Sequence, residues 1–168
     1  MNEAEILVQK ILANKPDDLD ALNSYGRILL QKECFFDAIK LFRHAFEIQN
    51  DDPKIIENLV RAVTLFSKQS IERNQHYLAE KLLRSMIVSL PEISELNCHL
   101  SFVLSQSGKC KEALAVSETA LELDHENPHS HDVRGLAFLG LGQLKLALSS
   151  FHKALAYNPN FVSAQVNL

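Results

Sequence analysis

The sequence predicts an all-α fold made of stacked pairs of antiparallel helices, and three observations lead to this expectation. Of the 168 residues, 46% are hydrophobic, but only five are glycine and five are proline, which favours helices and suffices for a core. Small and large apolar residues recur with a period of 34 residues, the mark of a repeat protein. Breaks with helix-stopping chemistry separate the amphipathic stretches. They lie at 14–18, 50–53, 89–92, 126–129 and 158–160.

The period is clearest when residues 142–160 are compared with residues 108–126. Gly142 lies 34 positions after Gly108, and alanines repeat at the same distance. The equivalent alanines are Ala113 and Ala147, then Ala120 and Ala154. The first part of the chain has the same spacing, because Gly26, Ala38, Phe42 and Ala45 are arranged as Gly135, Ala147, Phe151 and Ala154 are. Each period is therefore expected to be one structural unit.

Each unit is expected to contain a helix A and a helix B. The predicted A helices cover 19–32, 53–67, 94–106 and 128–141. The predicted B helices cover 35–49, 76–90, 110–124 and 144–157. Antiparallel helices that approach to about 8–10 Å need short side chains at the crossing, and Gly26, Ser101 and Gly135 in the A helices are expected to meet this need. Neighbouring units must stack, since one unit cannot bury its own apolar face.

We assign the whole chain to a single domain of repeats. The predicted boundaries are 1–18 for a leading partial repeat with helix B only, then 19–52, 53–93, 94–127 and 128–161, and 162–168 for the start of a truncated fifth repeat. In that last segment Val162, Val166 and Leu168 are expected to cover part of the preceding helix B. Because the chain stops just before an expected glycine, it is expected to be a piece of a longer array.

The second repeat is longer than the others. Pro53 and Ser94 are 41 positions apart, and the seven additional residues lie within 67–77. This segment has no glycine or proline and many helix-forming residues, so it favours a protruding hairpin in which both helices run about one turn longer. An irregular loop is the alternative.

These residues resemble the tetratricopeptide repeat family. The fourth repeat carries the resemblance best, through Gly135, Phe138, Gly142, Ala147, Phe151, Ala154 and Pro159. The third repeat departs from the pattern, with Ser117 at the aromatic position and His125 at the proline position, and the second has Val60 at the small position. The resemblance implies a right-handed α-α superhelix whose A helices line a concave groove that binds a peptide or partner helix.

The resemblance implies a set of partner-binding positions on the concave face. These are Asn23, Arg27, Glu57, Asn58, Arg61, Glu95, His99, Phe102, His129, Asp132 and Leu136. We expect Phe102 and Leu136 to act as apolar anchors, and Arg27 and Arg61 as polar guides. A carboxylate clamp for chaperone tails is disfavoured, because of its five matching positions only Asn58 fits. A ladder of asparagines is weakly supported, since the positions equivalent to Asn58 are Ser24, His99, Val133 and Asn167.

Several other functions are disfavoured. We expect no catalytic residues, because the acidic clusters lie at helix starts, where carboxylates cap free N–H groups, and no nucleophile or phosphate-loop motif occurs. We expect no metal and no cofactor, since His125, His129 and His131 point in different directions. The scattered positive charges and net charge of −4 disfavour nucleic acid. No signal peptide or membrane-spanning run is present, and the three cysteines lack a CxxC pair.

The sequence therefore predicts a cytoplasmic protein–protein interaction scaffold that is not an enzyme and has a protein or peptide partner. Two alternatives remain open. The chain could be the N-terminal recruiting region of a larger transferase-type enzyme. It could also be a self-assembling scaffold that forms a homo-oligomer through exposed repeat ends.

Overall fold

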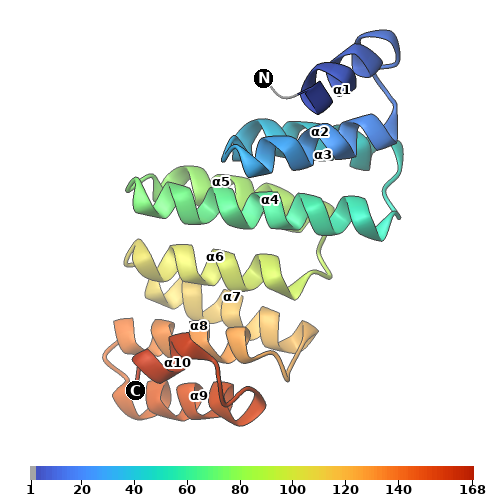
Figure 1. The fold of residues 1–168 in the computed structure, drawn as a ribbon. Coiled ribbons are helices and arrows are strands. Elements are labelled where there is room, and N and C mark those ends of the chain that lie inside the picture. The colour runs from blue at the N-terminus through green and yellow to red at the C-terminus, as the bar shows by residue number, and fades with distance from the viewer. Residues whose placement is uncertain (1–2) are drawn as a thin grey trace. The chain divides into compact units, whose positions relative to one another are not determined.

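The structure is a computed structural model that describes residues 3–168 (Figure 1). The leading repeat predicted over 1–18 begins in residues 1–2, which lie outside the described part. The described residues form ten helices and no strand. The chain divides into two compact units, Met1–Phe66 and Ser67–Leu168, and each is described by itself below. The assignment of one domain to the whole chain stays a prediction.

The first unit contains three complete helices and the first part of a fourth. They are α1 (Glu3–Asn14), α2 (Leu19–Gln31), α3 (Phe35–Ile48) and α4 (Pro53–Glu72), of which residues up to Phe66 belong here. Asp18 caps α2, because its side chain accepts a hydrogen bond from the Ala21 N–H at 2.9 Å. Leu22, Ala45 and Ile55 form a buried cluster that joins α2, α3 and α4.

The second unit contains the rest of α4 and six further helices. They are α5 (His76–Ser89), α6 (Ser94–Gln106), α7 (Cys110–Leu123), α8 (Pro128–Gly140), α9 (Leu144–Tyr157) and α10 (Val162–Val166). Cys98, Ala120 and Val133 form a buried cluster from α6, α7 and α8. A second cluster joins α9 to α10. Except for the end of α4, every predicted repeat helix is confirmed to within one residue.

Glycine at the A–B crossing is required by an aromatic ring on the partner helix. A Cβ atom added to Gly26 would lie 2.5 Å from the Phe42 ring, and one added to Gly135 would lie 2.3 Å from the Phe151 ring. Both distances are far inside van der Waals contact. The predicted role of these small residues is confirmed in both units.

The third repeat has different side chains at the crossing of its A and B helices. Ser101 replaces the glycine, and its Oγ donates a hydrogen bond to the Ala113 carbonyl oxygen at 2.8 Å. Ser117 replaces the aromatic residue and is fully buried. The smaller B-helix side chain thus accompanies a larger A-helix one, which explains why Ser101 and Ser117 occur in the same repeat.

Each A helix ends in the same left-handed turn. The residues with positive φ are Glu33, Asn74, Gly108 and Gly142. At Gly108 the N–H donates to the Ser105 carbonyl at 3.1 Å, and the Lys109 N–H donates to the Leu104 carbonyl at 2.9 Å. This pair of bonds is the Schellman motif, and the same bonds follow the other three helices. Gly108 and Gly142 supply this conformation without a Cβ penalty, whereas Glu33 and Asn74 adopt it with a side chain.

The seven additional residues of the second repeat lengthen only one helix. Helix α4 extends to Glu72, whereas α5 starts at His76, as a helix B of ordinary length would. The hairpin prediction is therefore right for α4 and wrong for α5, and the alternative of an irregular loop is wrong. The physical reason is the turn. Asn74 adopts φ 57° and closes the Schellman motif about two helical turns later than in the other repeats, since α4 has 20 residues and α2 has 13. All of the added length therefore lies in α4, which leaves the start of α5 unchanged.

Helix α10 covers α9 with a different face from the one predicted. Ala164 is fully buried and packs in one cluster with Ala147, Phe151 and Ala154. The three residues expected in this contact, Val162, Val166 and Leu168, are 67%, 78% and 50% exposed. The prediction was wrong because a small residue, and not a branched one, fits where α10 meets α9, as it does at the other helix contacts.

Candidate partner-binding surfaces

The first unit has a polar cavity between α2 and α4. It encloses about 170 Å³. Its lining residues are Arg27, Leu30, Gln31, Asn58, Arg61 and Leu65, and we call it the arginine cavity. Three of the predicted concave-face residues, Arg27, Asn58 and Arg61, are thus brought together, although they come from two different repeats.

Helical periodicity places both arginines on the same side of their repeats. Arg27 and Arg61 are 34 positions apart, and each follows a residue packed into the core, Gly26 or Val60. Both arginines are exposed. Within residues 3–168 neither forms a hydrogen bond or an ion pair. Two guanidinium groups therefore line one cavity with their donors available to a ligand.

The asparagines predicted in this surface connect neighbouring helices. The Asn58 Nδ2 donates to the Asn23 Oδ1 at 2.8 Å, over a separation of 35 residues. In the second unit, the Asn167 Nδ2 donates to the Asp132 Oδ1 at 3.1 Å over the same separation. These amides serve contacts between repeats, so they are not free for a peptide ladder. Glu57, the remaining predicted residue of this surface, is exposed one turn before Arg61.

The equivalent surface of the second unit is mostly closed. Glu95 is exposed, but His99 is 7% and Asp132 is 2% exposed, so the expectation that these two side chains lie open to a partner is corrected. Asp132 accepts hydrogen bonds from the Ser163 Oγ at 2.6 Å and from Asn167. The physical reason is α10, which lies beside α8 and α9 (Figure 1) and covers this carboxylate.

Two histidines are packed ring to ring in this surface. The ring centroids of His99 and His129 are 5.3 Å apart, and His129 contacts the ring of Phe161 at 6.1 Å. Burial lowers the pKa of His99 to about 3, and burial also lowers the pKa of His129. Both rings are therefore uncharged at neutral pH, which suits an apolar contact between α6, α8 and the segment before α10.

The two predicted apolar anchors already have partners within the chain. Phe102 is half-buried and packs against the cluster of Cys98, Ala120 and Val133. Leu136 is half-buried and packs against the α9–α10 cluster. Their role in binding a partner stays a prediction.

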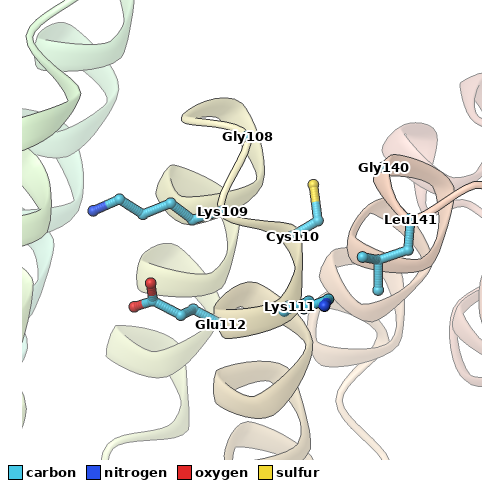
Figure 2. A pocket seen from close by; sticks show the side chains of 7 residues that line it. All are labelled: Gly108, Lys109, Cys110, Lys111, Glu112, Gly140 and Leu141. Carbon is cyan, nitrogen blue, oxygen red and sulfur yellow. The ribbon is translucent and has the colours of Figure 1, made fainter.

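A second cavity of about 320 Å³ surrounds Cys110 (Figure 2). The Cys110 side chain points toward the end of α8, whereas Lys109 and Glu112 point away from it on the other side of α7. A Cβ atom added to Gly140 would lie 2.3 Å from the Cys110 Sγ, so this thiol is a packing group. No base converges on it, and the cavity has no catalytic arrangement.

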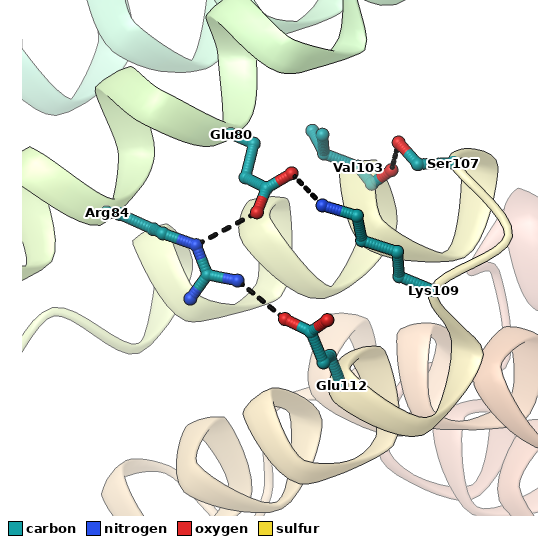
Figure 3. Close-up of polar contacts among 6 residues, drawn as sticks. All are labelled: Glu80, Arg84, Val103, Ser107, Lys109 and Glu112. Carbon is teal, nitrogen blue, oxygen red and sulfur yellow. Dashed lines mark hydrogen bonds and ion pairs between the residues drawn. The ribbon is translucent and has the colours of Figure 1, made fainter.

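Lys109 and Glu112 belong instead to a chain of ion pairs that joins α5 to α7 (Figure 3). Glu80 binds Arg84 at 3.0 Å and Lys109 at 2.9 Å, and Arg84 binds Glu112 at 2.8 Å. The hydrogen bond from Lys109, followed by that from Arg84, lowers the pKa of Glu80. Partly exposed pairs of this kind contribute little stability singly, so we interpret the network as a link between repeats.

A third cavity of about 390 Å³ contains His131 and Arg134. The His131 Nε2 donates to the His125 carbonyl at 3.0 Å, which leaves Nδ1 to accept from Arg134 at 3.4 Å. The His131 ring stacks on Tyr157 with centroids 5.4 Å apart. His131 is therefore held by packing and by hydrogen bonds within the chain. Across residues 3–168, no group of three or more His, Cys, Asp or Glu side chains is arranged to hold a metal ion.

Sequence reasoning missed the contact between α10 and Asp132. A signal for it exists in the sequence, because Asn23–Asn58 and Asp132–Asn167 share the 35-residue separation. A polar acceptor followed at this distance by asparagine could have identified both bonds between repeats. Within the described part of the chain, no helix is both long and apolar enough to cross a membrane, and all three cysteines are free.

Comparison with solved structures identifies the fold. The chain resembles the tetratricopeptide repeat protein YrrB, described as having an unusual peptide-binding site, with a TM-score of 0.68 and 17% identity over 96% of this chain and 80% of that one. TTC0263 of Thermus thermophilus, another such protein, gives 0.61 and 20% over 96% and 85%. MamA gives 0.69 and 17% over 94% and 88%. The chain therefore has the tetratricopeptide repeat fold, and the predicted all-α superhelical fold class is confirmed.

One curated relative is similar in sequence. It is the BBSome complex member bbs-4 of Caenorhabditis elegans, 26% identical over 125 residues. This match covers 73% of the chain but only 27% of the relative, so the chain spans about a quarter of that protein's length. No protein-family model matches the chain.

Proposed function

We propose that the chain is a protein-recognition module that binds a peptide or a partner helix at the arginine cavity of its first unit. The observation that carries the proposal is the meeting of Arg27, Asn58 and Arg61 in one cavity, with both guanidinium groups unpaired within residues 3–168. Rigid helix pairs can present such a surface without reorganising, which lowers the entropic cost of binding.

The similar proteins support this choice of function. YrrB is described as having a peptide-binding site, and bbs-4 is a member of a multi-protein complex. Recognition also fits these sites better than catalysis does, because none of the three cavities described above combines a nucleophile with a base.

A peptide selection with a blocking variant tests the proposal. Peptides are selected from a random library on the wild-type chain, and their affinities are then measured for Gln31→Trp, which fills the arginine cavity. The matched control is Gln49→Trp, at the exposed C-cap of α3 outside the cavity lining. We expect Gln31→Trp to weaken binding about tenfold or more and Gln49→Trp to leave it unchanged. Equal affinities for both variants would contradict the proposal.

Four further properties are proposals of the same kind. We infer a cytoplasmic location, which three free cysteines favour, and no interaction with nucleic acid. A recruiting role within a larger transferase-type enzyme predicts that the reading frame continues past Leu168 into a catalytic domain. Self-association through repeat ends predicts an apparent mass that rises with concentration in light scattering, and a constant monomer mass would contradict it.

A further inference from the structure

We infer that the arginine cavity selects an acidic segment of a partner protein, and that carboxylates of aspartate or glutamate side chains bind Arg27 and Arg61. The inference rests on the proposed function, because it specifies the ligand of the same cavity. It goes further than the proposed function because it specifies the chemistry of the partner: a groove could bind a peptide of any charge, whereas this cavity is inferred to prefer an acidic one.

The two arginines combine two features, the lack of an acidic partner among the described residues and a place in one cavity. Lys32 is paired with Glu5 at 2.5 Å, and Lys40 is paired with Asp37 at 2.9 Å. Arg27 and Arg61 have no such partner within residues 3–168, yet they line the same cavity. A planar guanidinium can hold a carboxylate through two parallel hydrogen bonds. Two of them in one cavity match two acidic side chains of one segment.

The rest of the cavity indicates what flanks the carboxylates. Leu30 and Leu65 supply half-buried apolar surface beside the arginines. The exposed Gln31 amide can donate to and accept from a peptide backbone. The segment that fits best therefore alternates acidic and apolar residues.

The net charge of the chain means that an acidic peptide can be attracted only by a local group of positive charges. With a net charge of −4, the chain repels an acidic peptide at long range, so attraction must come from a local site. The acidic residue closest in sequence to the pair is Glu57, which is exposed one helical turn before Arg61. The negative charge of Glu57 repels an acidic ligand bound at Arg61, and its neutralisation should therefore strengthen binding.

The test uses a fluorescein-labelled nonapeptide, Ser-Glu-Leu-Glu-Leu-Glu-Leu-Glu-Ser, and two versions with glutamine or phosphoserine in place of every glutamate. Fluorescence anisotropy gives each affinity at low and moderate salt. We expect the glutamate peptide to bind about tenfold more tightly than the glutamine peptide, with the difference shrinking as salt rises. Arg27→Gln and Arg61→Gln should each weaken binding of the glutamate peptide about fivefold or more, and Glu57→Gln should strengthen it about twofold.

Arg43→Gln is the matched control. Arg43 is exposed on α3 in the same unit, but it is outside the cavity, so its replacement should not change the affinity. An equal loss with Arg43→Gln would overturn the inference, because attraction would then be spread over the surface. Binding of the phosphoserine peptide alone would also overturn it, in favour of a phosphopeptide partner.

Failure of the inference and failure of the proposed function give different results. Equal binding of the glutamate and glutamine peptides, both weakened by Gln31→Trp, would overturn the acidic ligand and keep the groove. Binding of either peptide that Gln31→Trp does not weaken would overturn the groove as well. Circular dichroism spectra that match the wild type establish that each variant is folded.

Discussion

The inner surfaces of the two units use the same positions of the repeat for different purposes. In the first unit these positions hold Arg27 and Arg61, which are exposed and unpaired within residues 3–168. In the second unit they hold Phe102 and Leu136, which are half-buried and pack against clusters formed with neighbouring helices. Two other predicted residues of that surface, His99 and Asp132, are buried there as well. The difference teaches that a position in the repeat fixes the direction of a side chain, whereas the next helix in the stack decides whether that side chain meets solvent.

The largest expected effect tests what the two units share. Gly26→Ala and Gly135→Ala should each destabilise the chain by about 2–3 kcal/mol, because the added methyl group would overlap the Phe42 or Phe151 ring. Ser101→Ala is the control, since that crossing already holds a Cβ atom; it should cost about 1 kcal/mol through its lost hydrogen bond. Urea unfolding measures all three. If Gly135→Ala were as stable as the wild type, the second unit would not need glycine at its A–B crossing as the first unit does.

The second prediction concerns pH and separates the two inner surfaces. Burial holds the pKa of folded His99 at about 3, below the unfolded value of about 6.5. The unfolded chain therefore binds a proton that the folded chain does not, and the resulting stability is complete above pH 6.5 and is lost as the pH falls toward 3. From pH 7 to pH 5 the loss from His99 should be about 2 kcal/mol.

His99→Gln provides the comparison for this pH effect. Its free energy of unfolding should fall less than that of the wild type between pH 7 and pH 5, as measured in urea at both values. His129 and His131, whose pKa values burial also lowers, contribute in the same direction and remain in the variant. An identical pH dependence in the variant and the wild type would mean that His99 is not buried in the uncharged form.

The third prediction compares equivalent positions. Asp132→Ala removes the acceptor of two hydrogen bonds, from Ser163 in α10 and from Asn167 just after it, and should cost about 1–2 kcal/mol. Asn23→Ala removes the acceptor of one hydrogen bond and should cost about 1 kcal/mol. Hydrogen exchange should also show faster exchange in α10 for Asp132→Ala only. A larger cost at Asn23 than at Asp132 would reverse the comparison.

The smallest expected effect is at the arginine cavity. Arg27→Gln and Arg61→Gln remove no hydrogen bond or ion pair within residues 3–168, so each should change the free energy of unfolding by less than about 0.5 kcal/mol. Thermal unfolding with Arg43→Gln as the reference measures this. A loss of more than about 1 kcal/mol at either position would mean that these side chains stabilise the fold.

The helices could be predicted from the sequence because local rules determine them. Proline-containing breaks and the 34-residue period gave helix ends that agree with the structure, and Gly108 and Gly142 marked their turns. Glu33 and Asn74 adopt the same positive φ without glycine, so composition alone could not identify those turns. The length of α4 was hard to predict for the same reason. Its end is set by the hydrogen bonds of the turn at Asn74, and no glycine or proline in the sequence marks that position.

The candidate site was harder to predict, since burial depends on what packs over a residue. Arg27, Asn58 and Arg61 were predicted in one surface, and they line one cavity. The sequence pattern predicted that His99 and Asp132 are exposed on the same surface. In the structure α8 covers His99 and α10 covers Asp132. Ala164, and not Val162 or Val166, makes the contact with α9, a choice that small side chains and close helix approach determine together.

The most direct test of the account is a map of backbone amide shifts by NMR during titration with the glutamate peptide. We predict that the largest shifts occur in α2 and α4 around Arg27, Gln31 and Arg61, and that amides around His99 and Asp132 remain unchanged. Largest shifts in α6 and α8, or shifts of similar size on both inner surfaces, would contradict the claim that the peptide binds at the arginine cavity.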